Sequence, residues 1–409
     1  MSYMQKQNVQ TLKGFRDILP VDAVKRQWVK NIMVKTAEAW GYEPIETPTL
    51  EYFNLFKDEI GEDSKLIFQF EDNGGRQVAL RYDQTVPTCR YVANNFSALT
   101  FPFRRYQFQN VFRAEKPQKG RYRELTQFDV DIFGVKDATA DAEVIAENLD
   151  TYLKIGFKKP VIIFGSRKLM AGIPYEAIVA IDKLKKIGPD GVIADMIAKG
   201  ISAFQAQAYF DQVLNIKPDE DIKTIISYLE QSGFSSEFYR FEPTLARSFS
   251  YSDGPIWEAT IEDYTVGSVG GGERYDAMVK KITSQDIAAT GFAFGFDRTV
   301  EAADQLGLIP TLITKTNVLT AIFSPALQGQ ALSVARSLRE AGINTELYPE
   351  SSDKLEKQLK YAGKKSIPFA VIIGEDEIAS NTIVIKNIDT REQVKLSLEQ
   401  AIEMLSNRH

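Results

Sequence analysis

Residues 111–134 read VFRAEKPQKGRYRELTQFDVDIFG, and the interpretation of the whole chain begins with this stretch. On both sides of the central KPQKGRY, apolar and polar side chains alternate, and the centre itself contains Pro117 and Gly120. Alternation with a period of two predicts strands, and proline with glycine predicts a turn. We therefore expect a β-hairpin whose loop region carries four cations, Lys116, Lys119, Arg121 and Arg123.

The returning strand predicts two unlike faces for this hairpin. Side chains alternate along a strand, so the apolar residues point one way and the polar residues point the other. The apolar set is Phe128, Val130 and Ile132, and the polar set is Gln127, Asp129 and Asp131. On the outgoing strand, Arg113 and Glu115 share one face. A solvated hairpin with a charged tip is the ordinary interpretation, but this mixture suits a ligand that is part anion, part cation and part ring.

The segments FRAEKPQKGRYRE and TQFDVDIFG resemble motif 2 of the class II aminoacyl-tRNA synthetases, in the form found in histidyl-tRNA synthetases. The resemblance extends over nearly all 409 residues. LKGFRDILP resembles the N-terminal signature of the family, GYEPIETPTLE with Pro48 resembles motif 1, and ATGFAFGFDRTVEAADQLG matches motif 3. In the family, motif 1 forms part of a dimer interface, so the resemblance implies a homodimer.

Composition limits the chemistry that the chain can perform. One cysteine, Cys89, and one histidine, His409, argue against a metal site built from these residues and against a histidine general base. The net charge of −6 argues against non-specific coating of nucleic acid, so a nucleic acid must meet local basic patches. We find no apolar run near the roughly 18 residues of a membrane helix and no apolar signal segment in MSYMQKQNVQ. We expect a cytoplasmic protein without a membrane partner.

The length predicts two or three domains in a chain of mixed α/β class. By resemblance, residues 1–170 and 235–312 form an α+β catalytic core, in which helices flank an antiparallel sheet. Residues 171–234 have helical spacing and resemble the helical insertion of the family. Residues 313–409 alternate strand and helix, which predicts a largely parallel sheet and resembles an anticodon-binding domain. A lysine cluster there fits either a solvated face or a nucleic acid: Lys354, Lys357, Lys360, Lys364 and Lys365.

Activation of an amino acid joins its carboxylate to the α-phosphorus of ATP. This nucleophile is already ionised at neutral pH, so positioning, arginines and magnesium suffice. The resemblance implies ATP and Mg²⁺ as cofactors, and it assigns no metal ligand among the residues. It implies the catalytic residues Arg113, Arg247 and Arg298, and the ATP-binding residues Arg113, Glu115, Arg121 and Arg298. It implies the amino-acid-binding residues Asp83, Thr85, Gln127, Asp131, Arg247, Tyr251 and Ser252. Asp297 is expected to cap the helix that carries Arg298.

Two segments depart from the family pattern. In the histidine-specific motif R-G-L-D-Y-Y-T, Arg247 and Tyr251 match, but Ser252 replaces the second tyrosine, which contacts the imidazole in the family. In the motif G-G-G-R-Y-D-G, Glu273 is inserted before the arginine or replaces a glycine. The glycine run fits neither a Walker A spacing nor G-x-G-x-x-G, which disfavours P-loop and Rossmann enzymes.

The resemblance implies a histidine–tRNA ligase, which makes histidyl-adenylate and transfers the amino acid to the 3′ end of tRNA(His). One alternative is a related ligase for another amino acid or acceptor, which the departure at Ser252 keeps open. A second alternative is the non-catalytic regulatory subunit of ATP phosphoribosyltransferase. That subunit resembles the same core but lacks the C-terminal domain, so the domain and the arginines of motifs 2 and 3 argue against it.

Overall fold

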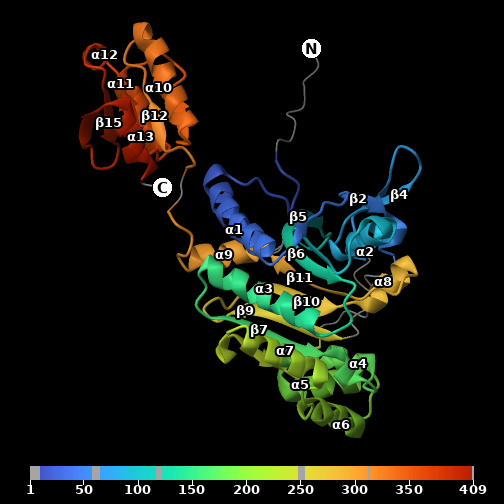
Figure 1. Ribbon diagram of the computed structural model, residues 1–409. Helices are drawn as coiled ribbons and strands as arrows, with labels where there is room; N and C mark the ends of the chain where they lie inside the picture. The colour runs from blue at the N-terminus through green and yellow to red at the C-terminus, as the bar shows by residue number, and fades with distance from the viewer. Residues whose placement is uncertain (1–9, 58–64, 117–121, 247–253, 312–313, 408–409) are drawn as a thin grey trace. The chain divides into compact units, whose positions relative to one another are not determined.

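The computed structural model describes residues 10–57, 65–116, 122–246, 254–311 and 314–407. The chain forms two compact units (Figure 1). The first unit contains Trp28–Leu308 together with the described residues before Ile18, and the second contains Ile18–Gln27 and the chain from Ile309 onward. Within the described part of the chain, no helix is both long enough and apolar enough to cross a membrane.

An eight-stranded sheet is the centre of the first unit, with the order β1-β5-β6-β11-β10-β9-β7-β8. The six inner strands pair antiparallel, whereas β1 and β8 at the two edges pair parallel with their neighbours. The strands are β1 (Glu43–Pro44), β5 (Phe103–Phe112), β6 (Glu124–Phe133), β7 (Pro160–Ser166), β8 (Tyr239–Phe241), β9 (Pro255–Ile261), β10 (Gly270–Arg274) and β11 (Ala289–Gly295). The expected hairpin is the pair β5–β6, so this prediction is confirmed.

One face of the sheet is apolar and is covered by α3 (Thr139–Ile155), which lies along the strands in Figure 1. The ring of Tyr152 on α3 is 5.2 Å from the ring of Phe294 on β11. Trp257 on β9 is fully buried and donates a hydrogen bond from Nε1 to Asn148 Oδ1 at 3.2 Å. Gly272 lies above this indole, because a Cβ at that position would come within 2.3 Å of Trp257.

A buried ion pair also joins this face of the sheet to α3. Arg274, at the end of β10, places Nη2 2.6 Å from Asp141 Oδ2, and both side chains are almost completely buried. Thr290 on β11 donates to the other oxygen of Asp141 at 2.6 Å. Burial raises the pKa of Asp141 to about 6, and the nearby arginine opposes that rise.

The other elements of the first unit surround the sheet. A three-stranded sheet with the order β2-β4-β3 contains β2 (Leu50–Tyr52), β3 (Gln69–Glu71) and β4 (Gln77–Leu80). The remaining helices are α1 (Pro20–Ala39), which belongs to this unit from Trp28 onward, α2 (Thr85–Asn94), α8 (Asp276–Thr283) and α9 (Phe296–Gln305). Single-turn 3-10 helices are η1 (Phe53–Leu55), η3 (Phe96–Ala98), η4 (Arg167–Met170) and η5 (Ser236–Phe238).

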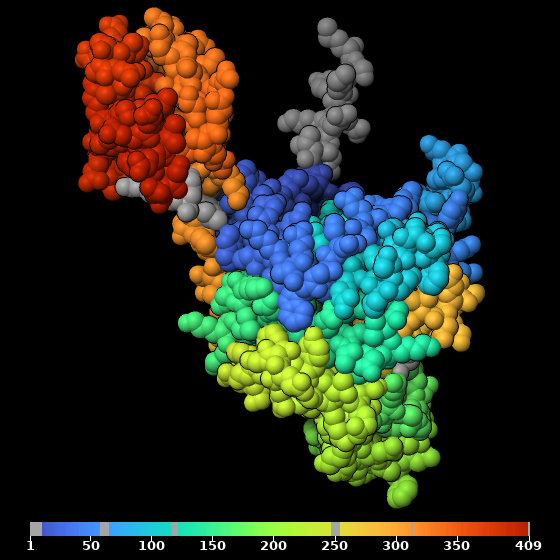
Figure 2. Space-filling view, viewed as in Figure 1, coloured from blue at the N-terminus to red at the C-terminus, as the bar shows by residue number. Residues whose placement is uncertain are grey.

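Residues 175–231 contain four helices, of which the first three share an apolar cluster. The helices are α4 (Tyr175–Ile181), α5 (Leu184–Ala198), α6 (Ala203–Leu214) and α7 (Glu220–Gln231). Met196 and Phe210 are buried in their common cluster, and α7 packs on α3. In Figure 2 these helices, in green and yellow-green, gather into one block.

The second unit contains a five-stranded mixed sheet with the order β13-β12-β14-β15-β16. β12 pairs parallel with β13 and β14, whereas β15 pairs antiparallel with β14 and β16. The prediction of a largely parallel sheet was therefore wrong for the two pairings that involve β15. The strands are β12 (Val318–Thr320), β13 (Thr345–Leu347), β14 (Phe369–Ile372), β15 (Ile383–Asn387) and β16 (Gln393–Leu396). The helices are η6 (Pro325–Leu327), α10 (Gln328–Glu340), α11 (Leu355–Lys364), α12 (Glu375–Ala379) and α13 (Leu398–Ser406).

The buried pair between Arg274 and Asp141 yields a stability prediction. Arg274→Leu leaves Asp141 without its cation, so the first unit should lose about 3–5 kcal/mol of unfolding free energy. All three tryptophans lie in this unit, so urea unfolding followed by their fluorescence measures it. The control is Lys136→Ala, which breaks an exposed pair with Asp286 and should leave the transition unchanged. If Arg274→Leu and the wild-type protein unfold at the same urea concentration, the ion pair does not stabilise the first unit as stated.

Candidate active site

The face of the sheet opposite α3 carries polar side chains in registered rows. In antiparallel sheets, directly paired residues point to the same face. Asp131 of β6 pairs with Gly291 of β11, and Gly291 pairs with Glu273 of β10. The next row along the strands is Asp129, Ala293, Gly271 and Glu258. The residues on β11 and at Gly271 are small, so they leave open space above the backbone.

A small pocket of about 80 Å³ lies on this face and adjoins a larger one of about 380 Å³. Asp83, Thr85, Asp131 and Glu273 line the small pocket, and Glu115 lines the larger one. The residues that line both are Arg113, Gln127, Gly271 and Ala293. Arg113 therefore lies where the two pockets meet.

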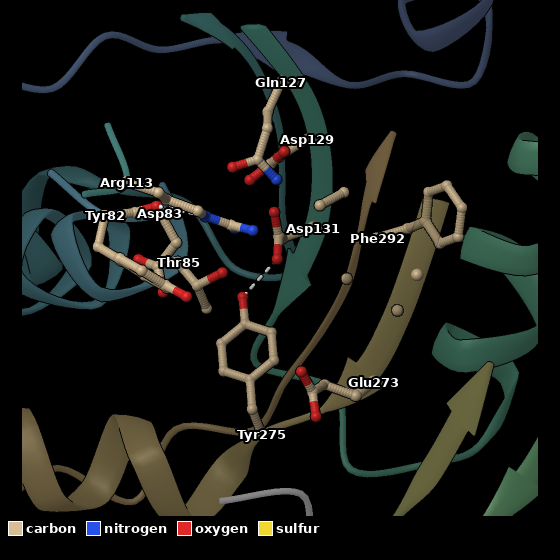
Figure 3. Close-up of a pocket in the computed structure, with 14 residues that line it drawn as sticks. Tyr82, Asp83, Thr85, Arg113, Gln127, Asp129, Asp131, Glu273, Tyr275 and Phe292 are labelled. Atoms are coloured by element: carbon tan, nitrogen blue, oxygen red, sulfur yellow. Dashed lines mark hydrogen bonds between the residues drawn. The ribbon is translucent and has the colours of Figure 1, made fainter. Parts of the chain in front are cut away.

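Asp83 and Arg113 lie side by side in the lining of the small pocket, although they come from different segments (Figure 3). Asp83 precedes α2 and accepts a hydrogen bond from the backbone N–H of Val86 at 3.1 Å. Arg113 follows β5 and donates from Nε to the carbonyl oxygen of Tyr82 at 3.3 Å, with its guanidinium 4.6 Å above the Tyr82 ring. Burial raises the pKa of Asp83 to about 6, while Arg113 opposes this rise.

Asp131 lies at the inner end of the pocket and already has two partners in the protein. Its Oδ2 is 2.5 Å from Nη2 of Arg105, which is fully buried on β5, and its Oδ1 accepts a hydrogen bond from the Tyr275 hydroxyl at 2.5 Å (Figure 3). Burial raises the pKa of Asp131, and Arg105 opposes that rise. Gly291 is required here, because a Cβ would lie 1.8 Å from Asp131 Oδ1.

Two acceptor atoms beside these groups are available to a ligand. Among the described residues, Gln127 Oε1 and Asp129 Oδ1 are buried and accept no hydrogen bond. Burial raises the pKa of Asp129 well above its ordinary value. A bound ammonium group would supply donors to such acceptors and would favour the ionised form of the neighbouring carboxyls.

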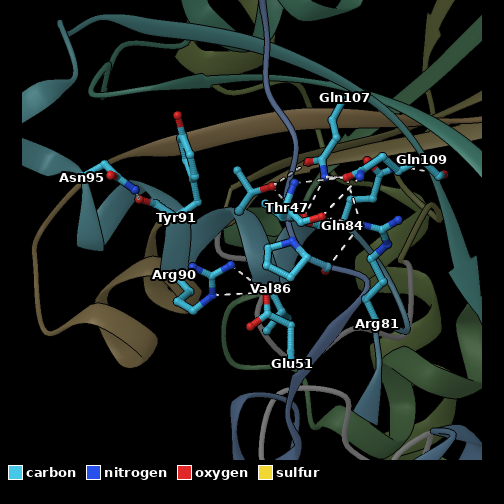
Figure 4. Close-up of polar contacts among 12 residues, drawn as sticks. Thr47, Glu51, Arg81, Gln84, Val86, Arg90, Tyr91, Asn95, Gln107 and Gln109 are labelled. Atoms are coloured by element: carbon cyan, nitrogen blue, oxygen red, sulfur yellow. Dashed lines mark hydrogen bonds and ion pairs between the residues drawn. The ribbon is translucent and has the colours of Figure 1, made fainter. Parts of the chain in front are cut away.

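A polar network holds the segment before α2 against the hairpin (Figure 4). Arg81 is buried and donates from Nη1 to the carbonyl oxygen of Thr47 and to Gln109 Oε1, both at 2.9 Å. Gln107 donates from Nε2 to Thr47 Oγ1 at 2.8 Å. Gln84 donates to the carbonyl oxygen of Gln127 at 3.1 Å. These bonds position the backbone that carries Asp83.

The larger pocket contains the expected residues Glu115 and Arg298, with Glu258 on β9. Arg298 donates from Nη1 to the carbonyl oxygen of Ser268 at 2.8 Å. The prediction that Asp297 caps the following helix was wrong, because α9 begins at Phe296 and Asp297 lies within its first turn. Asp297 instead pairs with Arg16 and accepts the backbone N–H of Thr126 at 2.9 Å, which joins three segments.

The structure therefore brings together most of the residues that the sequence singled out. Six of them line one or both pockets with Arg113: Asp83, Thr85, Glu115, Gln127, Asp131 and Arg298. Four others lie outside the described residues: Arg121, Arg247, Tyr251 and Ser252.

Sequence reasoning gave no role to several residues that contribute to these pockets. Tyr275 and Glu273 stood in a quoted motif, but only the pairing of β10 with β11 brings them beside Asp131 and Asp83. Asp129 was placed on the polar face without a role. Arg105 precedes the quoted stretch, and only the strand register shows that it lies opposite Asp131.

This antiparallel sheet with flanking helices has the fold of a class II aminoacyl-tRNA synthetase core. A family model described as "Histidyl-tRNA synthetase" matches residues 14–187, and one described as "Anticodon binding domain" matches residues 314–408.

Individual proteins match along almost the whole chain. The histidine–tRNA ligase of Cytophaga hutchinsonii is 32% identical over 446 residues, which cover 96% of this chain and 98% of that protein. The histidine–tRNA ligase of Wolinella succinogenes is 32% identical over 431 residues and covers 97% of each chain. The crystal structure of histidyl-tRNA synthetase from Nostoc sp. PCC 7120 superposes with a TM-score of 0.86 at 26% identity, covering 99% of this chain and 100% of that one. The chain belongs to the histidyl-tRNA synthetase family, which confirms the resemblance and the fold class.

The raised pKa of Asp83 predicts how stability depends on pH. The folded protein holds this proton up to about pH 6, whereas the unfolded chain releases it near its ordinary value of 3.8. The protonated Asp83 therefore contributes its full share of the unfolding free energy below pH 3.8, and this contribution is lost as the pH rises through 6. Asp83→Asn keeps an acceptor for the Val86 N–H. Its free energy of unfolding should exceed that of the wild-type protein by roughly 2–3 kcal/mol at pH 7.5 and should match it near pH 4. Urea unfolding at the two pH values measures this, and an equal difference at both would refute it.

Proposed function

We propose that this protein is an ATP-dependent histidine–tRNA ligase. It activates histidine to histidyl-adenylate and transfers the histidyl group to the 3′ end of tRNA(His). Membership of the family supports this proposal, and the observation that carries it is the meeting of a small acidic pocket and a larger pocket at Arg113. A guanidinium at this junction attracts both the carboxylate of an amino acid and the α-phosphate of a nucleotide.

In the proposed reaction, the amino-acid carboxylate attacks the α-phosphorus and pyrophosphate leaves. Arg113 holds the two anions together and stabilises the charge that develops on the phosphoryl oxygens. Asp83, Thr85 and Gln127 hold the ammonium group, and Asp129 adds an acceptor beside them. This placement directs the carboxylate of the amino acid towards Arg113.

The nucleotide occupies the larger pocket. Glu115 accepts from the adenine amino group, and Arg298 holds the outer phosphates. The sequence assigns Arg121 to the outer phosphates and Arg247 to the α-phosphate, and both lie outside the described residues. These two assignments, and those of Tyr251 and Ser252 in the amino-acid pocket, remain predictions from the sequence.

Magnesium would accompany the nucleotide. The described residues contain no group of three or more histidine, cysteine, aspartate or glutamate side chains that could hold a metal ion. Mg²⁺ commonly takes one or two carboxylates from the protein and completes its coordination with phosphates and water. Glu258, which lines the larger pocket, fits that requirement. When bound, the ion would neutralise phosphate charge.

The proposed partners are histidine, tRNA(His) and a second copy of the chain in a homodimer, and the proposed location is the cytoplasm. We propose residues 1–170 and 235–312 as the catalytic core, 171–234 as the insertion and 313–409 as the anticodon-binding domain. In this last domain, Lys357 and Lys365 pair with Asp353 and Glu346. The other lysines of the cluster, Lys354, Lys360 and Lys364, have no ion pair among the described residues and are better placed for phosphates.

Histidine-dependent exchange of pyrophosphate into ATP tests the reaction. Arg113→Ala and Arg298→Ala should each reduce exchange about a hundredfold or more, because each removes a charge-assisted phosphate contact. Arg336→Ala, an exposed arginine of the second unit, should leave exchange unchanged. Near-normal exchange in either pocket variant would remove that arginine from the proposed site.

The same assay separates the alternatives. A non-catalytic regulatory subunit would show no exchange with any amino acid. A related ligase would exchange with another amino acid and not with histidine. The match of residues 314–408 to an anticodon-binding domain favours the ligase over the regulatory subunit.

The triple variant Lys354→Glu, Lys360→Glu and Lys364→Glu tests the role of the second unit. Reversing three charges should weaken aminoacylation of tRNA(His) and should make it less sensitive to salt, while exchange stays at the wild-type rate. Lys136→Glu in the first unit is the control, and it should change neither activity. Unchanged aminoacylation by the triple variant would exclude these lysines from tRNA binding.

A further inference from the structure

Glu273 and Asp131 face each other across a single glycine. β6, β11 and β10 are adjacent strands, and their register aligns Asp131, Gly291 and Glu273 in one row on the pocket face. The register between β10 and β11 runs without interruption from Gly270 to Arg274, so Glu273 takes a regular strand position and forms no bulge. With strands about 4.8 Å apart, the Cα atoms of the two acids lie roughly 10 Å from each other.

Gly291 puts no side chain between the two acids, and the Asp131 carboxyl itself extends over it. A Cβ at Gly291 would overlap Asp131 Oδ1, so no side chain can occupy this position while Asp131 stays in place. Both acids line the small pocket, and Glu273 is only 9% exposed. Its charge contributes to the raised pKa of Asp83, which indicates that its carboxylate faces the same cavity.

The surroundings of Asp131 differ from those of Glu273. Arg105 and the Tyr275 hydroxyl each engage one oxygen of Asp131, so its orientation is set before a ligand arrives. The other charged or titratable groups that face this end of the pocket are Asp83, Asp129 and Arg113, and Arg167 on η4 lies near Glu273. Glu273 is a second carboxyl on the same face of the sheet, two strands away from Asp131.

We propose that the side chain of the bound amino acid lies in the small pocket between these two carboxyls, and that Glu273 determines specificity by accepting an N–H from its outer ring nitrogen. This inference rests on the proposed function, because it takes the ring to be the imidazole of histidine. A buried imidazole needs a partner for each nitrogen. An ionised carboxylate only accepts hydrogen bonds, so two of them select a ring with a proton on both nitrogens.

Two methylated substrates test this geometry in the wild-type protein. Histidine methylated on either ring nitrogen loses one N–H, so pyrophosphate exchange should fall about a hundredfold or more with each analogue. A site with one ring acceptor would reject one of them and accept the other.

Glu273→Gln tests the residue itself while nearly preserving its shape. The KM for histidine should rise roughly tenfold to hundredfold, because a charged acceptor is lost, while the KM for ATP stays unchanged. Discrimination against one of the two methylated histidines should also weaken. Glu262→Gln is the control, because Glu262 follows β9 outside both pockets and pairs with exposed Lys159.

The outcomes separate this inference from the proposed function. If wild-type protein shows no exchange with histidine, the proposed function fails. If it exchanges but Glu273→Gln keeps the wild-type KM and the same discrimination, Glu273 has no such role. If Glu273→Gln fails to fold, as judged by tryptophan fluorescence, the methylated substrates decide, and strong exchange with either one overturns the inference.

Discussion

The first unit is arranged about its antiparallel sheet, because successive residues on each strand must point to opposite faces. On one face the aromatic side chains of β6, β9 and β11 pack beneath α3. On the other face the same strands present carboxyls, amides and small residues. The covered face supplies the burial that stabilises the sheet, so the opposite face can hold polar groups for binding.

Two glycines show how tightly these faces are built. Gly272 allows the indole of Trp257 to pack against β10, and Gly291 allows Asp131 to lie against β11. They serve opposite faces of neighbouring strands. A methyl group at either would collide with a side chain that the other parts of the fold hold in place. The small residues of the central strands are therefore part of the site, although they contribute no functional group.

The pocket holds carboxyls in a state that costs stability. Burial raises the pKa values of Asp83, Asp129 and Asp131, which means that their charged forms are disfavoured until a cation arrives. Arg105 offsets part of this cost at Asp131. An ammonium group would relieve more of it at Asp83. In the proposed reaction, binding of the amino acid would recover part of this cost, a common compromise between stability and activity.

The sequence by itself determined the hairpin, its two faces and seven of the residues that line the pockets. It could do so because alternation, turns and motif resemblance are local properties of the chain. It could not determine which strands are neighbours. The second sheet is mixed because β15 pairs antiparallel with both β14 and β16, and no local sequence pattern predicts the direction of these pairings. Asp297 likewise bonds to distant Arg16 and Thr126 instead of capping its helix. Only the tertiary structure placed Arg105, Tyr275 and Glu273 around Asp131 and Gly291, because strand register and burial arise from hydrogen bonding between segments far apart in the chain.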